Sequence, residues 1–271
     1  LRTTFSIAAG DVQAVRGVSF ALDRGRTLGI VGESGCGKTV LARSIMRLNL
    51  GSNVTTTGTA EFAGRDLLSL PMADMHEMWG MELAMVFQDP MTSLNPVKKV
   101  GEQIAESLRV HLKRSRKEAR DEAGDLLEQV GIPEPRKRLT QYPHELSGGL
   151  RQRVVIAKAL ACSPRLLIAD EPTTALDVTI QAQILGLIKQ LQVETGTAMM
   201  LITHDMGVIA EVADRVVVMS QSKIVEQGPV DQIFHSPREA YTRGLISAVP
   251  KLGSMAGHDG PRPFNLAGDL A

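Results

Sequence analysis

A glycine-rich segment offers the clearest chemistry in the sequence. Residues 32–39 read Gly-Glu-Ser-Gly-Cys-Gly-Lys-Thr and fit the pattern GxxxxGK[ST]. Glycines allow successive backbone N–H groups to surround phosphate oxygens, while the lysine can reach the β and γ phosphates and the threonine hydroxyl can bind Mg²⁺. We therefore expect a nucleoside triphosphate site. Its predicted residues are Gly32, Ser34, Gly35, Cys36, Gly37, Lys38, Thr39 and Val40.

Two adjacent carboxylates provide a second chemical group. Asp170 and Glu171 directly follow the apolar run Leu166–Ala169, which is typical of a buried strand. Such a strand delivers its last residues to the carboxyl edge of a parallel sheet, where phosphates bind. There Asp170 can hold a magnesium-bound water, and Glu171 can polarise the water that attacks the γ-phosphate. We predict that Glu171 is catalytic.

Three further pieces qualify as phosphate or water contacts. Ser147, Gly148 and Gly149 precede an apolar helix, so they form a second helix N-terminus suited to a phosphate, although an ordinary N-cap would look the same. Gln88 ends an apolar strand, and His204 ends the strand 199–203. A single histidine at such a place is more often structural than catalytic.

Alternating strands and helices are predicted around these residues. Two strands with a turn at Arg24-Gly25 are expected within residues 12–31, and apolar residues at helical spacing predict a helix from Lys38 to Leu48 and another over 178–194. Residues 97–160 read as an inserted helical region. The alternation favours an α/β fold with a mainly parallel sheet. The other strands are expected at 82–87, 166–169, 198–202 and 216–219.

In this order the pieces resemble the nucleotide-binding domain of ATP-binding cassette (ABC) transporters. The resemblance covers roughly residues 5–250 and includes the LSGG signature at 146–149. It implies a P-loop ATPase with a RecA-like core and an antiparallel β subdomain in residues 1–88 and 164–250. A helical signature subdomain would occupy 89–163, and 251–271 would be a tail or linker.

The resemblance also implies roles for single residues. In that family two cassettes enclose two ATP molecules, so Ser147, Gly148 and Gly149 would contact the ATP of the second cassette, with Asp177 near the junction. His204 would contact the γ-phosphate, Phe5 would stack on adenine, and Mg²⁺ would be held by Thr39, Gln88 and Asp170. Leu150 departs from the glutamine that many members carry after LSGG.

Finer motifs resemble the oligopeptide, dipeptide and nickel branch of bacterial importers. They are residues 87–96 (FQDPMTSLNP), 142–146 (YPHEL) and 170–183, while 241–264 is most similar to the first cassette of tandem glutathione importers. The implied partners are a second cassette, two membrane-spanning permease subunits and an extracytoplasmic binding protein, with the chain at the cytoplasmic face of the cell membrane. We expect peptides or glutathione as cargo, and no iron–sulfur segment in this chain.

Composition favours an ordinary packed protein over a disordered chain. Of the 271 residues, 43% are hydrophobic, which is enough for a packed core, and 30 basic against 30 acidic residues give no overall attraction to nucleic acid. Two cysteines without a CxxC pair exclude a disulfide scaffold and a structural zinc site. We see no signal peptide at Leu1, and the Gly- and Pro-rich tail leads us to expect the first half of a longer polypeptide.

A soluble ABC ATPase of DNA repair or translation is the main alternative. The basic residues between Lys98 and Arg120 could be offered as a nucleic-acid patch. However, no aromatic residue lies between Phe87 and Tyr142, so base stacking is unsupported. A solvated helical face is favoured, and docking at the membrane comes second. A degenerate, non-catalytic module is not supported because every motif residue is present, and no NKxD motif supports a GTPase.

Overall fold

The computed structural model describes residues 1–49, 51–173 and 178–248 as a mixed α/β protein. Its strands are β1 (Arg2–Ile7), β2 (Gly10–Arg16), β3 (Thr27–Val31), β4 (Val54–Thr57), β5 (Glu61–Phe62), β6 (Arg65–Asp66), β7 (Leu83–Val86), β8 (Leu166–Asp170), β9 (Ala198–Ile202), β10 (Arg215–Ser220) and β11 (Lys223–Pro229). Its helices are α1 (Lys38–Ile45), α2 (Met72–Met78), α3 (Pro90–Ser93), α4 (Val100–His111), α5 (Arg116–Gln129), α6 (Pro135–Arg138), the 3₁₀ turn η1 (Pro143–Glu145), α7 (Gly148–Leu160), α8 (Val178–Thr195), α9 (Met206–Val212), α10 (Val230–His235) and α11 (Ala240–Ser247).

A six-stranded central sheet positions the candidate site. Its order is β11-β10-β3-β9-β8-β7, and every neighbouring pair is parallel except β10 with β11. Each strand predicted for this sheet is present within one or two residues of its expected bounds. Because β3, β9, β8 and β7 run parallel to one another, their carboxyl ends all lie at the same edge of the sheet. The predicted mainly parallel P-loop fold is confirmed.

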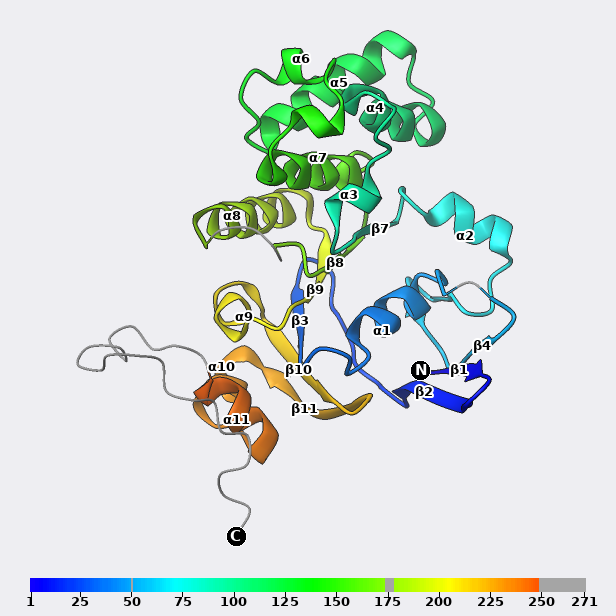
Figure 1. Ribbon diagram of the computed structural model, residues 1–271, viewed down its shortest axis with the longest axis vertical. Coiled ribbons are helices and arrows are strands. Elements are labelled where there is room, and N and C mark those ends of the chain that lie inside the picture. Colours follow the sequence, from blue (N-terminus) through cyan, green and yellow to red (C-terminus); the bar gives the residue numbers. More distant parts are fainter. Residues whose placement is uncertain (50, 174–177, 249–271) are drawn as a thin grey trace, which may run out of the picture.

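Alternation along the strands separates two hydrophobic cores. In β8, Leu167 and Ala169 pack in the core that contains α7, α8 and α9, while Leu166 and Ile168 pack in the core that contains α1 and α2. Successive side chains of a strand point to opposite faces, so both faces of this sheet are covered by helices. Figure 1 shows α8 and α9 on one side of the sheet and α1 on the other. A sheet buried on both faces holds its strand ends rigidly.

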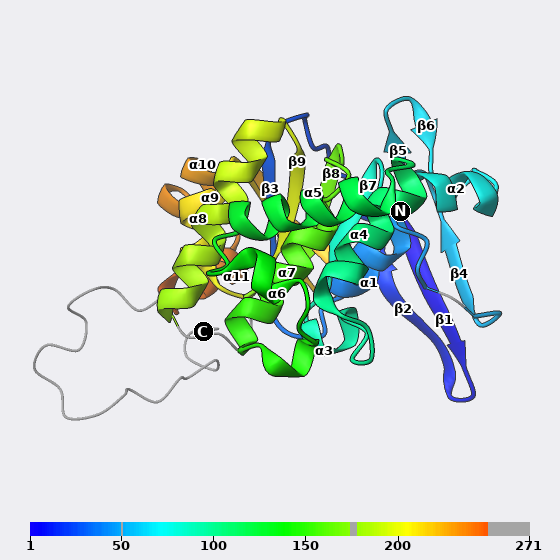
Figure 2. The same ribbon diagram turned by 90° about the horizontal axis from the view of Figure 1, so that it is seen from above.

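The two strands predicted between residues 12 and 31 belong to different sheets. β2 pairs with β1 in a three-stranded antiparallel sheet of order β2-β1-β4, whereas β3 lies in the central sheet between β10 and β9. The small sheet projects to one side of the molecule in Figure 2. A turn residue such as Gly25 (φ +66°) marks where the chain changes direction, but not which sheet follows it.

Helices α3 to α7 form the inserted region that the sequence predicts. Figure 1 shows most of these helices grouped at the top of the molecule, above α8 and the central sheet. α5 begins with a capping box in which the Ser115 hydroxyl accepts from the Glu118 N–H and the Glu118 carboxylate accepts from the Ser115 N–H. Among the described residues, no helix combines the length and apolar character needed to cross a membrane.

Candidate nucleotide site

The phosphate loop (residues 32–39) connects β3 to α1 at the carboxyl edge of the sheet, as the motif predicts. Gly35 and Gly37 both have positive φ values, +81° and +100°, which favour glycine. A Cβ at Gly37 would lie 2.2 Å from the Ala14 carbonyl oxygen of β2, whereas a Cβ at Gly35 would meet nothing within 4 Å. The small antiparallel sheet therefore fixes the loop from behind, and the Gly35 side stays open for a ligand.

The Lys38 ammonium lies inside the loop. This side chain is only 5% exposed, and its Nζ donates hydrogen bonds to the carbonyl oxygens of Gly32, at 2.7 Å, and Glu33, at 2.9 Å. A buried ammonium is tolerated only where oxygen atoms compensate its lost hydration. The two carbonyls do so here, and phosphate oxygens would replace them as stronger acceptors.

Thr39 and Asp170 meet next to the loop. The Thr39 hydroxyl donates to Asp170 Oδ1 at 3.1 Å, and Asp170, at the end of β8, is 1% exposed. Burial raises the pKa of the Asp170 carboxyl, and the neighbouring Glu171 carboxylate adds to the rise, while the Thr39 hydrogen bond opposes it. The positive charges of Arg43 and Lys38 oppose the rise as well, but burial outweighs them. A hydroxyl beside a carboxylate is the hard-oxygen pair that Mg²⁺ prefers.

We predict that Asp170→Asn stabilises the nucleotide-free protein. A carboxyl whose folded-state pKa lies above its ordinary value of 3.8 binds more protons when folded, so stability falls as the pH rises through the window between the two values. Above that window the whole cost is present, and an uncharged amide removes it. Thermal unfolding with a chelator and without nucleotide should show a Tm increase of about 2–4 °C.

The exposed Asp23 supplies the matched control, since Asp23→Asn makes the same chemical change at the surface. That variant should shift the Tm by less than about 1 °C. If Asp170→Asn instead lowers the Tm, then Thr39, Arg43 and Lys38 together compensate the buried charge more strongly than its burial penalises it.

Glu171, Gln88 and His204 form one cluster from the ends of three strands. Gln88 Nε2 donates to Glu171 Oε2 at 3.0 Å, and His204 Nδ1 lies 3.4 Å from Glu171 Oε1. Glu171 adopts a left-handed backbone conformation with φ +47°, which is uncommon for a residue with a side chain. This turn carries the carboxylate out of line with β8. Such strained positions are concentrated at functional sites.

The signature residues occupy the start of α7. The Ser147 hydroxyl caps this helix by accepting from the Leu150 N–H at 3.4 Å, and a Cβ at Gly149 would lie 3.0 Å from Ile180 of α8. Gly148 is the first residue of the helix. Within the described part of the chain, no hydrogen bond joins these residues to the phosphate loop. The signature residues are therefore not hydrogen-bonded to this chain's own loop.

Two predicted residues stand apart from this edge of the sheet. Phe5 is half-buried on β1, on the same strand face as Thr3, whose hydroxyl lies 2.7 Å from that of Ser44 on α1. The predicted adenine contact of Phe5 remains a prediction. Asp177 lies outside the described residues.

One contact at the loop was not predicted. The Tyr241 phenol oxygen, from α11, accepts a hydrogen bond from the Glu33 backbone N–H at 3.2 Å across 208 residues of sequence. No local pattern predicts a contact of that separation. The only signal in the sequence is the resemblance of the segment around Tyr241 to peptide importers.

A buried lysine in a glycine loop, a hydroxyl–carboxylate pair and a Gln–Glu–His cluster meet at one edge of a parallel sheet, and this combination defines a P-loop nucleoside triphosphatase. The sequence comparisons narrow this class. Residues 15–174 match the family described as ABC transporter, and residues 225–265 match the C-terminal region of oligopeptide and dipeptide transporters. The chain belongs to the ABC transporter family and is an ATPase cassette.

Two curated relatives are similar over 94% of this chain. The oligopeptide transport ATP-binding protein OppD of Bacillus subtilis (strain 168) is 56% identical over 255 residues, and the match covers 71% of its length. The glutathione import ATP-binding protein GsiA of Escherichia coli (strain K12) is 57% identical over 261 residues, and the match covers 42% of its length. The chain thus spans less than half of the second relative.

Solved structures agree with the fold. The dimeric structure of MJ0796, a bacterial ABC transporter cassette, matches with a TM-score of 0.76 at 26% identity, over 84% of this chain and 96% of that chain. A dimeric post-hydrolysis state of the same cassette, bound to ADP and phosphate, matches with a TM-score of 0.74 at 25% identity, over the same shares. The predicted RecA-like core with a helical insertion is therefore confirmed as a fold.

Proposed function

We propose that this cassette hydrolyses ATP to drive the import of peptides through membrane-spanning partner subunits. The observation that carries the proposal is the Gln88–Glu171–His204 cluster beside the phosphate loop, in a chain 56% identical to an oligopeptide transport ATP-binding protein. A cytoplasmic position against the membrane follows from this role. A DNA repair or translation ATPase is not favoured, because the relatives are import proteins.

Each residue of the site has a task in hydrolysis. Lys38 would exchange its two carbonyl partners for the β and γ phosphates, because phosphate oxygens carry full charge. Glu171 would accept a proton from the attacking water, and Gln88 and His204 would hold its carboxylate in place. Thr39, Asp170 and Gln88 would hold Mg²⁺, which neutralises charge on the phosphates.

A second cassette would complete the site. Ser147 and Gly149 lie at the start of α7, where backbone N–H groups and the helix dipole favour a phosphate. Since no hydrogen bond joins them to this chain's own loop within the described residues, we propose that they contact the ATP bound by a partner cassette. Residues 89–163 would move as one subdomain during this closure.

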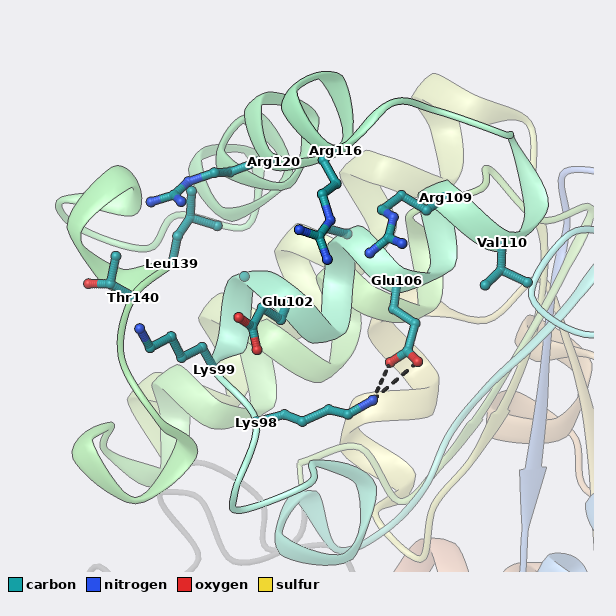
Figure 3. Close-up of a pocket in the computed structure, with 12 residues that line it drawn as sticks. Lys98, Lys99, Glu102, Glu106, Arg109, Val110, Arg116, Arg120, Leu139 and Thr140 are labelled. Atoms are coloured by element: carbon teal, nitrogen blue, oxygen red, sulfur yellow. Dashed lines mark hydrogen bonds and ion pairs between the residues drawn. The ribbon is translucent and has the colours of Figure 1, made fainter.

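The membrane partner has a candidate docking surface on α4 and α5. A basic pocket of about 620 Å³ is lined by five cationic side chains and two carboxylates, and Lys98 pairs with Glu106 at 3.0 Å (Figure 3). The other cations make no hydrogen bond or ion pair within the described residues; they are Lys99, Arg109, Arg116 and Arg120.

Unpaired cations at one pocket favour an acidic partner segment. The pocket shares Lys98 and Glu106 with a second hollow formed by residues after Gln88, so a docked segment would lie next to residues 92–96, which follow Gln88 in the chain. We propose that an acidic cytoplasmic segment of the permease docks here. Motion at the nucleotide would then reach the membrane subunit through α3 and α4.

Purification of the native complex in mild detergent tests the proposal. We expect two multi-spanning membrane proteins to accompany the chain. The double substitution Arg109→Glu and Arg116→Glu should release them, whereas charge reversal at the distant Lys223 should not. A complex of soluble proteins alone, or one that carries nucleic acid or ribosomes, would overturn the transport role and leave the ATPase intact.

A further inference from the structure

The C-terminal helix α11 contacts the phosphate loop through a single hydroxyl group. Tyr241 Oη accepts the hydrogen bond from the Glu33 N–H, and the Ser220 hydroxyl of β10 lies near the same oxygen. Burial raises the pKa of the Tyr241 phenol, so the phenol is neutral at physiological pH. The Tyr241 side chain also packs against the core that contains buried residues of α9 and α10.

Hydrogen bonds to a carboxylate of β11 attach the start of α11 to the central sheet. The Glu226 carboxylate of β11 accepts hydrogen bonds from the backbone N–H groups of Arg238, at 2.8 Å, and Glu239, at 3.1 Å, and so fixes the residues before the helix. Thr242, next to Tyr241, is fully buried. Figure 1 shows α10 and α11 beside the β10–β11 edge of the central sheet. These contacts connect α11 to β11, a strand of the central sheet, and so restrict where the phenol oxygen can lie.

Glu33 connects this helix to Lys38, the predicted phosphate-binding lysine. Its N–H donates to Tyr241, and its carbonyl oxygen accepts from Lys38 Nζ at 2.9 Å. Nucleotide binding requires Lys38 to leave that carbonyl while the loop keeps the shape that presents its N–H groups to phosphate. A bond that anchors Glu33 from outside the loop would preserve this shape when the lysine leaves. Without the anchor, fewer molecules hold the competent loop, and the apparent affinity falls by that fraction.

We propose that Tyr241 is a positioning residue for the phosphate loop, through which α11 sets the affinity of the site for ATP. The inference rests on the proposed nucleotide site. Tyr241 lies within residues 225–265, the part that matches the oligopeptide and dipeptide transporter C-terminal region, and outside residues 15–174, which match ABC transporters in general. The anchor thus belongs to the segment that distinguishes the peptide-importer branch.

Tyr241→Phe tests the role, because it removes the hydroxyl and keeps the ring. Titration of the full chain with MgATP should show a dissociation constant about 3- to 10-fold higher, the effect expected of one net hydrogen bond. The KM for ATP should rise by the same factor while kcat at saturation changes less than about 2-fold, and amide exchange at Glu33 should become faster. A purely structural role would instead lower the Tm of the nucleotide-free protein and leave KM unchanged.

Tyr142→Phe is the matched control, since it removes the other tyrosine hydroxyl, which lies in the helical region with its ring stacked on His144. It should not change ATP affinity. Wild-type protein that fails to bind ATP overturns the proposed function and this inference together. Wild-type binding that Tyr241→Phe leaves unchanged, or tightens, overturns the inference alone.

Discussion

Glu171→Gln is expected to retain ATP binding and lose hydrolysis by about 10²- to 10⁴-fold, the usual contribution of a positioned general base. In the wild type, Gln88 Nε2 donates a hydrogen bond to Glu171 Oε2 at 3.0 Å. The amide oxygen of the glutamine can still accept this bond, so the arrangement of the cluster is kept. What the variant loses is the ability to take a proton from water. Steady-state phosphate release and an ATP titration, made on the same preparation, separate the two effects.

The control for this substitution is Glu128→Gln, which makes the same change on the exposed surface of α5. Its hydrolysis rate should stay within about 2-fold of wild type. Near-normal turnover by Glu171→Gln would remove Glu171 from the catalytic role. Loss of ATP binding by the same variant would mean that its charge is needed to build the site.

Lys38→Ala is expected to weaken ATP binding by about 10- to 100-fold, because charge-assisted hydrogen bonds to phosphate are the strongest that the loop can offer. Lys38 is only 5% exposed, so its ammonium group is already desolvated in the loop. Binding the phosphates therefore costs little further loss of hydration. Isothermal titration with MgATP and with MgADP measures the loss.

A matched control is Lys117→Ala on the exposed surface of α5, which removes one positive charge from the helical region. Its affinity for ATP should equal that of wild type. An unchanged affinity in Lys38→Ala would show that the nucleotide does not bind at the glycine-rich loop.

The sequence could predict the parts of the fold that have strong local signals. Leu166–Asp170 and Ala198–Ile202 are continuous apolar runs, and both are fully buried strands at nearly the predicted bounds. The separation of β2 from β3 into two sheets could not be predicted, because Gly25 only marks a change of direction. Pairing partners depend on contacts between residues distant in sequence, and no periodicity records them.

The candidate site shows the same division. Lys38, Gln88, Asp170, Glu171 and His204 were each predicted from a strand or loop that ends beside them, and a parallel sheet brings such ends to one edge. The Tyr241–Glu33 contact, the left-handed Glu171 and the inward Lys38 ammonium depend on tertiary packing. These features arise where α11, β8 and the loop pack together, and no local sequence pattern encodes such packing.

ATP hydrolysis by the purified native complex tests the central claim most directly. The rate should rise when an extracytoplasmic binding protein loaded with oligopeptide is added, should fall to background in a complex that carries Glu171→Gln, and should respond less to the empty binding protein. Glutathione offered in place of the oligopeptide compares the cargoes named for the two curated relatives. If no loaded binding protein changes the rate of a complex with intact Glu171, that result would contradict peptide import as the function of this cassette.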